Sequence, residues 1–188
     1  MVNDMKTIFT VFLAMIAFNG CASSEVFSMN KNCYIPAEYV TIADQITIEV
    51  GNTLIKRHNL ILSGVSGGMA GCVNTIGLSF HIRGVQSKER LRYILVDSVE
   101  EFLRAINSNE RLRPHLKRYP FTSEEITIEI FVRDEEGREQ FDPAISVAAA
   151  GRGRIDYKTV ARENVYAFKS RVQETYEEAK KIVEANIQ

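Results

Sequence analysis

The chain has 188 residues, of which 45% are hydrophobic and 25% are charged, and its formal net charge is −1. This composition is typical of a globular protein, and it excludes a disordered chain, a collagen-like repeat and a protein with many membrane spans. The near-neutral charge gives no indication of nucleic-acid binding. Because a domain commonly has about 150 residues, the length predicts one domain with a short extra segment.

The N-terminus has the pattern of a targeting signal. Lys6 precedes an uncharged apolar run from Ile8 to Phe18, in which Thr10 is the only polar residue. A membrane-spanning helix needs about 20 such residues, whereas a run of this length is typical of a secretory signal peptide. We therefore expect residues 1–20 to be a signal peptide.

The end of this run, Phe18-Asn19-Gly20-Cys21, resembles the lipobox of bacterial lipoproteins. In that family the cysteine sulfur receives a diacylglyceryl group, the peptide is cut before the cysteine, and the new amine is acylated. The resemblance implies a lipid on Cys21 and anchoring in the cell envelope. Ala22 stands where Asp would favour the inner membrane, which implies the outer membrane, with the protein facing the periplasm or the exterior. The alternatives are a secreted protein cleaved after Ser23 and an uncleaved anchor.

The remaining cysteines form an even pair. If Cys21 carries lipid, Cys33 and Cys72 are left in an oxidising compartment, where a disulfide can form. Such a bridge would close a loop of about 40 residues and stabilise the fold by roughly 4 kcal/mol. The alternative is two separate thiols, with Cys72 as a small core residue. Neither has the spacing of a metal ligand, so we expect no metal and no cofactor.

Three segments of different character follow the predicted signal peptide. Residues 21–35 are weakly patterned and suit a lipidated tether, so we expect a single domain over 36–188. Apolar residues recur at helical spacing over 37–62, which predicts a helix there. The glycine-rich stretch 64–71 is expected to be a flexible connector.

Alternation of apolar and polar residues marks the two clearest strands. It occurs over 76–83 and again over 126–133, and its period of two predicts one buried and one exposed face. Between these strands, Ser87 is a good N-cap for a helix that continues to Ile106. The stretch 107–120 is expected to contain turns and one short helix.

The last third of the chain is predicted to be a set of strands followed by a helix. We expect a turn at 134–137, a strand near 144–150, a hairpin turn at 151–153 and a strand near 154–160. From Val165 to Val183 the apolar residues recur at spacings of three and four. This spacing predicts a long C-terminal helix.

The predicted order is helix, strand, helix, three strands and helix. Apolar helix stripes need the apolar faces of strands, so we expect an α+β two-layer sandwich with about four strands in a mixed sheet and helices mainly on one face. The strands at 76–83 and 126–133 are joined by a helical crossover and are expected to be parallel. Shorter connections predict antiparallel pairing elsewhere.

The middle of the chain, residues 81–121, resembles a group of uncharacterised bacterial envelope lipoproteins. This resemblance covers under half of the mature chain and implies no known activity. The residues that carry it are Glu101-Phe102-Leu103, Ala105-Ile106-Asn107, Leu112-Arg113-Pro114 and Tyr119-Pro120-Phe121.

One short motif suggests catalysis. Residues 64–68 spell G-x-S-x-G, the pattern of a nucleophile elbow, in which a serine stands on a sharp strand-to-helix turn. Ser66 would then need a base, for which His81 or His115 is a candidate, with Asp97, Asp134 or Asp156 to orient it. Only about 40 mature residues precede Ser66, which is short for the strands that carry an oxyanion loop. A small serine hydrolase is therefore the alternative function, and a glycine-rich connector is the structural alternative.

A set of polar side chains indicates a binding surface. If the alternation is right, they point away from the buried faces of their strands, and helices on one side only would leave them together on an open face. We therefore expect a non-catalytic binding or structural role in the cell envelope, with other envelope proteins or cell-wall material as partners. His58 and His115, on helical segments, are expected to be exposed. The candidate binding residues are His81, Arg83, Glu129, Arg133, Asp156 and Lys158.

Overall fold

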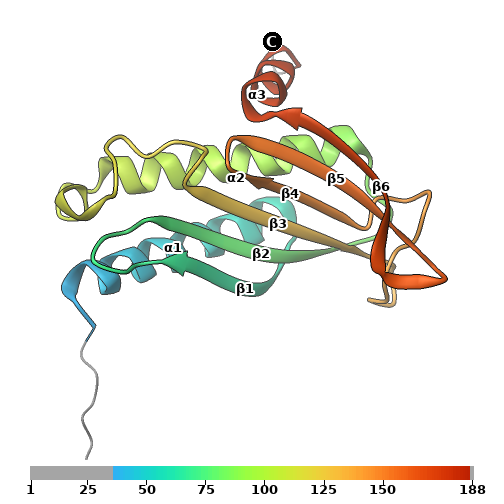
Figure 1. Ribbon diagram of the computed structural model, residues 1–188, viewed down its shortest axis with the longest axis horizontal. Helices are drawn as coiled ribbons and strands as arrows, with labels where there is room; N and C mark the ends of the chain where they lie inside the picture. The colour runs from blue at the N-terminus through green and yellow to red at the C-terminus, as the bar shows by residue number, and fades with distance from the viewer. Residues whose placement is uncertain (1–35, 187–188) are drawn as a thin grey trace, which may run out of the picture. The chain divides into compact units, whose positions relative to one another are not determined.

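A mixed sheet forms the centre of the molecule (Figure 1). The structure is a computed structural model that describes residues 36–186, and within this range six strands pair in the order β1-β2-β3-β4-β5-β6. β2 and β3 are parallel, and the other neighbours are antiparallel. In chain order the elements are α1 (Glu38–His58), β1 (Ile61–Gly68), β2 (Thr75–Arg83), α2 (Lys88–Ser108), the short 3-10 helix η1 (Arg113–His115), β3 (Ile126–Arg133), β4 (Val147–Gly151), β5 (Arg154–Ala161), β6 (Asn164–Thr175) and α3 (Tyr176–Ala185).

The two long helices cover one face of this sheet. α1 packs on β1 and β2, and α2 crosses β3, β4 and β5, so the sheet stands in front of both helices in Figure 1. α1 approaches β2 closely because it carries Gly51, where a Cβ would lie 3.4 Å from Leu78. The apolar positions of the strands meet the helices here. The largest fully buried side chains include Phe80, Phe102, Leu54, Leu78, Leu95, Ile106 and Ile128.

The α+β class, the mixed sheet and the parallel β2–β3 pair agree with the prediction from sequence. Ser87 caps α2 as expected, because its hydroxyl accepts a hydrogen bond from the Arg90 amide at 3.1 Å. Among the described residues, no helix combines the length and the apolar character needed to cross a bilayer. The predicted number of about four strands was wrong, because the sheet has six. The two additional strands are the segment predicted as a connector and part of the segment predicted as the C-terminal helix.

The first correction concerns the glycine-rich segment, which is the edge strand β1. α1 ends at His58, and Asn59 adopts a left-handed conformation with φ 56° that turns the chain directly into the strand. β1 pairs with β2 through its backbone, while most of its side chains are exposed. An edge strand with little buried side-chain surface leaves no alternating pattern by which it could be predicted.

The second correction concerns the C-terminal helix, which is much shorter than predicted. Asn164–Thr175 is a strand that pairs with β5, and only Tyr176–Ala185 is helical. The helix begins at a capping box, in which Thr175 and Glu178 each bond the backbone of the other. The apolar spacing before Thr175 is compatible with a helix, but β5 offers a free edge whose hydrogen bonds take this segment into the sheet. Such a long-range pairing is invisible to a local pattern.

Candidate functional site

All six predicted binding residues lie on the face of the sheet opposite α1 and α2. The strand register brings them together: Arg83 stands beside Arg133, and His81 is beside Phe131. Glu129 and Asp156 flank Ala149 on its two sides. Within residues 36–186 no helix covers this side, and we call it the open face. The structure therefore brings the predicted residues together, whereas their role in binding stays a prediction.

Several polar groups of the open face are held by hydrogen bonds or ion pairs to neighbouring side chains. Arg133 donates from Nε to His81 Nδ1 at 3.1 Å and also pairs with Glu139 at 3.2 Å. Ser79 donates to Glu129 at 3.0 Å. Arg171 makes a bidentate contact with Asp156, at 2.7 and 2.8 Å.

These contacts set the charge states of two groups. Hydrogen bonding from Arg171 lowers the pKa of Asp156, so this carboxylate stays ionised. Burial, and then the neighbouring Arg133 charge, lower the pKa of His81. A neutral imidazole is consistent with the bond from Arg133, because only an unprotonated Nδ1 accepts a hydrogen bond.

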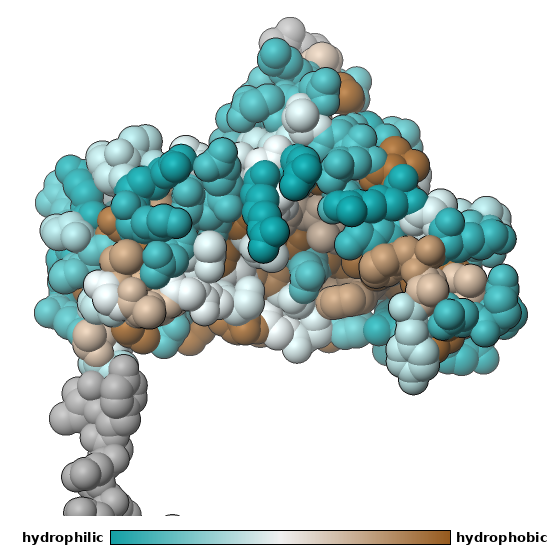
Figure 2. Space-filling view, viewed as in Figure 1, coloured by the Kyte–Doolittle hydropathy of each residue, from teal (hydrophilic) through white to brown (hydrophobic). Residues whose placement is uncertain are grey.

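One end of the open face is apolar and hollowed. Phe131, Val147, Val165 and Phe168 line a depression of about 210 Å³, which lies where β5 and β6 turn. We call it the apolar hollow. The Lys158 ammonium lies 4.7 Å from the centre of the Phe168 ring. Figure 2 shows hydrophobic surface gathered at this end, between hydrophilic areas. An apolar depression with cations at its rim suits a ligand that has both an apolar and a polar or anionic part.

Ser66 and His81 do not meet. Ser66 lies within β1 beside Gly77, whereas His81 lies four residues further along β2. At about 3.4 Å per residue this separates the two by roughly 14 Å. The nucleophile elbow also requires a strand-to-helix turn, but this G-x-S-x-G segment is an extended edge strand. The geometry of the described residues gives the serine no base.

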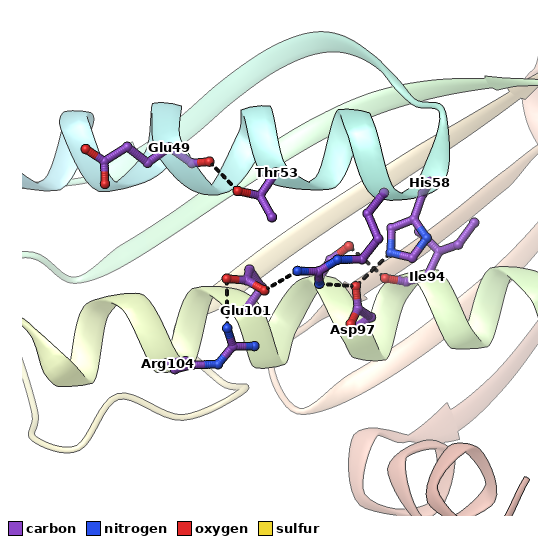
Figure 3. Close-up of polar contacts among 9 residues, drawn as sticks. Glu49, Thr53, His58, Ile94, Asp97, Glu101 and Arg104 are labelled. Carbon is purple, nitrogen blue, oxygen red and sulfur yellow. Dashed lines mark hydrogen bonds and ion pairs between the residues drawn. The ribbon is translucent and has the colours of Figure 1, made fainter. Parts of the chain in front are cut away.

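A buried histidine is the polar feature that the sequence prediction missed (Figure 3). The prediction that His58 is exposed was wrong: the residue is 3% exposed. Its Nε2 lies 2.7 Å from a carboxylate oxygen of Asp97. The guanidinium of Arg57 forms ion pairs with Asp97 at 2.7 Å and with Glu101 at 2.8 Å. These contacts link α1 to α2. The burial of His58 was predictable from the sequence, because the residue continues the apolar stripe of Val50 and Leu54 at a spacing of four.

The surroundings of this histidine set its charge. Burial lowers the pKa of His58, and the hydrogen bond that the ring donates to Asp97 only partly offsets this effect. For Asp97, burial acts to raise the pKa, but hydrogen bonds from Arg57 and His58 outweigh it and the pKa is lowered. We infer a neutral imidazole that donates from Nε2 to an ionised carboxylate. The second ring nitrogen, Nδ1, has no hydrogen-bond partner among the described residues.

The remaining predicted sites are the cysteines, two of which lie outside the described residues, and His115. Cys21 and Cys33 lie outside residues 36–186, so lipidation and the Cys33–Cys72 bridge stay predictions. Cys72 is half-buried, with its Sγ 3.7 Å from Asn74 Oδ1. His115 is exposed and stacks on Tyr39, with ring centres 5.1 Å apart.

The open face and its apolar hollow are thus the best candidate for a functional surface. Within the part of the chain that the structure describes, no three His, Cys, Asp or Glu side chains are grouped so as to hold a metal ion. The open face instead combines paired charges, small residues and an apolar depression. Comparisons of the chain with protein-family models, with curated proteins and with solved structures found no match.

Proposed function

We propose that this protein is a membrane-anchored bacterial lipoprotein whose domain has a non-catalytic binding role in the cell envelope. A lipid on Cys21 would hold the chain at the membrane, most consistently with the outer membrane, and several acyl chains together give firm anchoring. The open face would bind the partner, either another envelope protein or cell-wall material. The observation that carries the proposal is the uncovered face of the sheet, with its apolar hollow beside Lys158 and Arg133.

The hydrogen bonds on this face support a binding role. The carboxylates of Glu129 and Asp156 accept hydrogen bonds from neighbouring side chains, and His81 accepts one from Arg133. Contacts of this kind hold the side chains of the open face in fixed positions, which reduces the entropy lost when a partner docks. Exposed apolar side chains in a depression contribute to affinity by leaving water when a partner docks.

Photocrosslinking in intact cells tests the binding role. A photoreactive residue in place of Val147 in the hollow should give a discrete adduct, whereas one in place of Ile48, which is 61% exposed on α1, should not. The adduct should decrease when Phe168→Ala is added, because Phe168 lines the same hollow. Equal adducts from both positions, or none from Val147, would contradict a binding role for the open face.

Two further measurements separate this proposal from its alternatives. Mass spectrometry of the mature N-terminus should show acylated Cys21, and Cys21→Ser should release the protein from the membrane fraction. A fluorophosphonate probe distinguishes the serine hydrolase, the alternative function. Labelling that disappears in Ser66→Ala would replace the non-catalytic role, and we expect no labelling because Ser66 lacks a nearby base.

A further inference from the structure

A second pocket lies at the same end of the sheet as the apolar hollow, where α1 and β2 end and β1 and α2 begin, and its Arg83 stands beside Arg133 of the hollow. It has a volume of about 460 Å³, which is within the range of small-molecule sites. It shares no lining residue with the hollow. The lining residues are His58, Asn59, Ile61, Ile82, Arg83, Gln86 and Arg90.

The charge of this pocket is positive. Arg83 and Arg90 line it, and no carboxylate does so among the described residues. Arg83 donates to the backbone oxygen of Glu135 at 2.6 Å. Arg90 contacts the face of the Tyr93 ring, with its guanidinium carbon 5.8 Å from the ring centre. Neither arginine forms an ion pair with a carboxylate of residues 36–186, in contrast to Arg57, Arg92, Arg133 and Arg171.

The wall of the pocket adds a buried polar group. The side chain of His58 is 1% exposed, and Asp97 holds its Nε2 from the α2 side. The other ring nitrogen, Nδ1, has no partner among the described residues, and Figure 3 shows it on the side of the ring turned away from Asp97. Because Nε2 donates to Asp97, Nδ1 is a hydrogen-bond acceptor, so it would take a donor such as a ligand hydroxyl or a water molecule and does not itself favour an anion.

The N-terminal end of α2 favours an anionic ligand, as the two arginines do. Gln86 immediately precedes the N-cap Ser87, and Arg90 lies in the first turn of this 21-residue helix. The N-terminal end of a helix carries a partial positive charge that favours anions. Ile61 and Ile82 supply an apolar wall on the strand side. A ligand that matches the two arginines, the helix end and the apolar wall has a compact anionic group and a small apolar part.

We propose that this pocket binds a small molecule through a compact oxyanion, a phosphate or a carboxylate, held between the guanidinium groups of Arg83 and Arg90. Guanidinium groups bind oxyanions in a bidentate way, which gives direction as well as affinity. The apolar wall would contact the organic part of the ligand. This site goes beyond the proposed binding role, because it uses a different pocket and a different class of ligand.

Titration of the full-length protein in mild detergent tests this site, with inorganic phosphate, sulfate and acetate as probes at constant ionic strength. We expect saturable binding, with NMR shifts confined to the side chains of Arg83 and Arg90 and the ring of His58. Arg90→Gln should weaken binding roughly tenfold, because one charged hydrogen-bonding group is lost. Arg83→Gln combined with Arg90→Gln should abolish it.

A matched control uses the same helix. Arg104→Gln removes a positive charge from α2 that is paired with Glu101 and does not line the pocket, so it should leave binding unchanged. Unfolding curves of each variant check that the fold is retained. Shifts that do not saturate, or equal weakening by Arg104→Gln and Arg90→Gln, would overturn the proposal. Photocrosslinking at Val147 in the hollow does not depend on this pocket, so either proposal can fail alone.

Discussion

The two faces of the sheet differ in what their side chains do, and β3 shows the difference within a single strand. Ile126, Ile128 and Ile130 are fully buried against the helices, whereas Glu129 and Phe131, between and beside them, remain partly exposed on the open face. The covered face stabilises the fold by removing apolar surface from water. The open face keeps polar and aromatic groups accessible. The same strands therefore carry core residues and accessible residues at alternate positions.

The largest expected contrast comes from truncating one aromatic side chain on each face. Phe80 is 0% exposed in the core, so Phe80→Ala should lower the free energy of unfolding by about 3–5 kcal/mol. Phe131 lines the open hollow and is only partly buried, so Phe131→Ala should cost less, about 1–2 kcal/mol. Chemical denaturation of both variants measures this difference. Similar losses for the two would show that the open face is buried in the folded protein.

A pair of glycines tests how closely the strands pack on the open face. A Cβ at Gly77 would collide with the Thr127 carbonyl oxygen and lie 2.7 Å from the Ser66 hydroxyl. Gly77→Ala should therefore destabilise the protein by about 1–3 kcal/mol through overpacking. At Gly64 the new Cβ would lie 3.7 Å from the Ser79 Cβ, an ordinary contact, so Gly64→Ala should be nearly neutral. Equal midpoints of denaturation for the two variants would contradict the tight β2–β3 contact.

The two histidines, His58 between the helices and His81 on the open face, should contribute differently to the loss of stability in acid. His58 has a lowered pKa in the folded protein, so below about pH 6.5 the unfolded chain binds a proton that the folded protein does not. The free energy of unfolding therefore decreases as the pH is lowered. His81 has a lowered pKa for the same main reason, burial, but it is more exposed, so its contribution should be smaller. Carboxylates whose pKa is lowered, such as Asp97 and Asp156, act only in more acidic solution.

Denaturation midpoints between pH 7.5 and about 5.5 measure this effect. His58→Gln should flatten the dependence of stability on pH more than His81→Gln does. Glutamine keeps a side-chain donor for Asp97, so the α1–α2 contact is less disturbed than by alanine. If both variants keep the slope of the original protein, another group takes up the proton.

The sequence determined the elements whose signal is local. β2 and β3 have strict alternation because one of their faces is buried, and α2 has both an N-cap at Ser87 and an apolar stripe. The six candidate residues of the open face were predictable for the same reason, since a period of two assigns every second side chain to the other face. The parallel pairing of β2 and β3 followed from the helix between them.

Only the tertiary structure decided the edges of the sheet and the contacts between distant segments. β1 and β6 are strands because β2 and β5 offer hydrogen-bonding partners, and neither needs a strong pattern of its own. His58 meets Asp97 because α1 and α2 pack side by side, and the pocket at Arg83 and Arg90 exists where α1 and β2 end and β1 and α2 begin. Local patterns report the environment of a residue's own turn or strand, but pairing and pocket formation depend on residues far away in the chain.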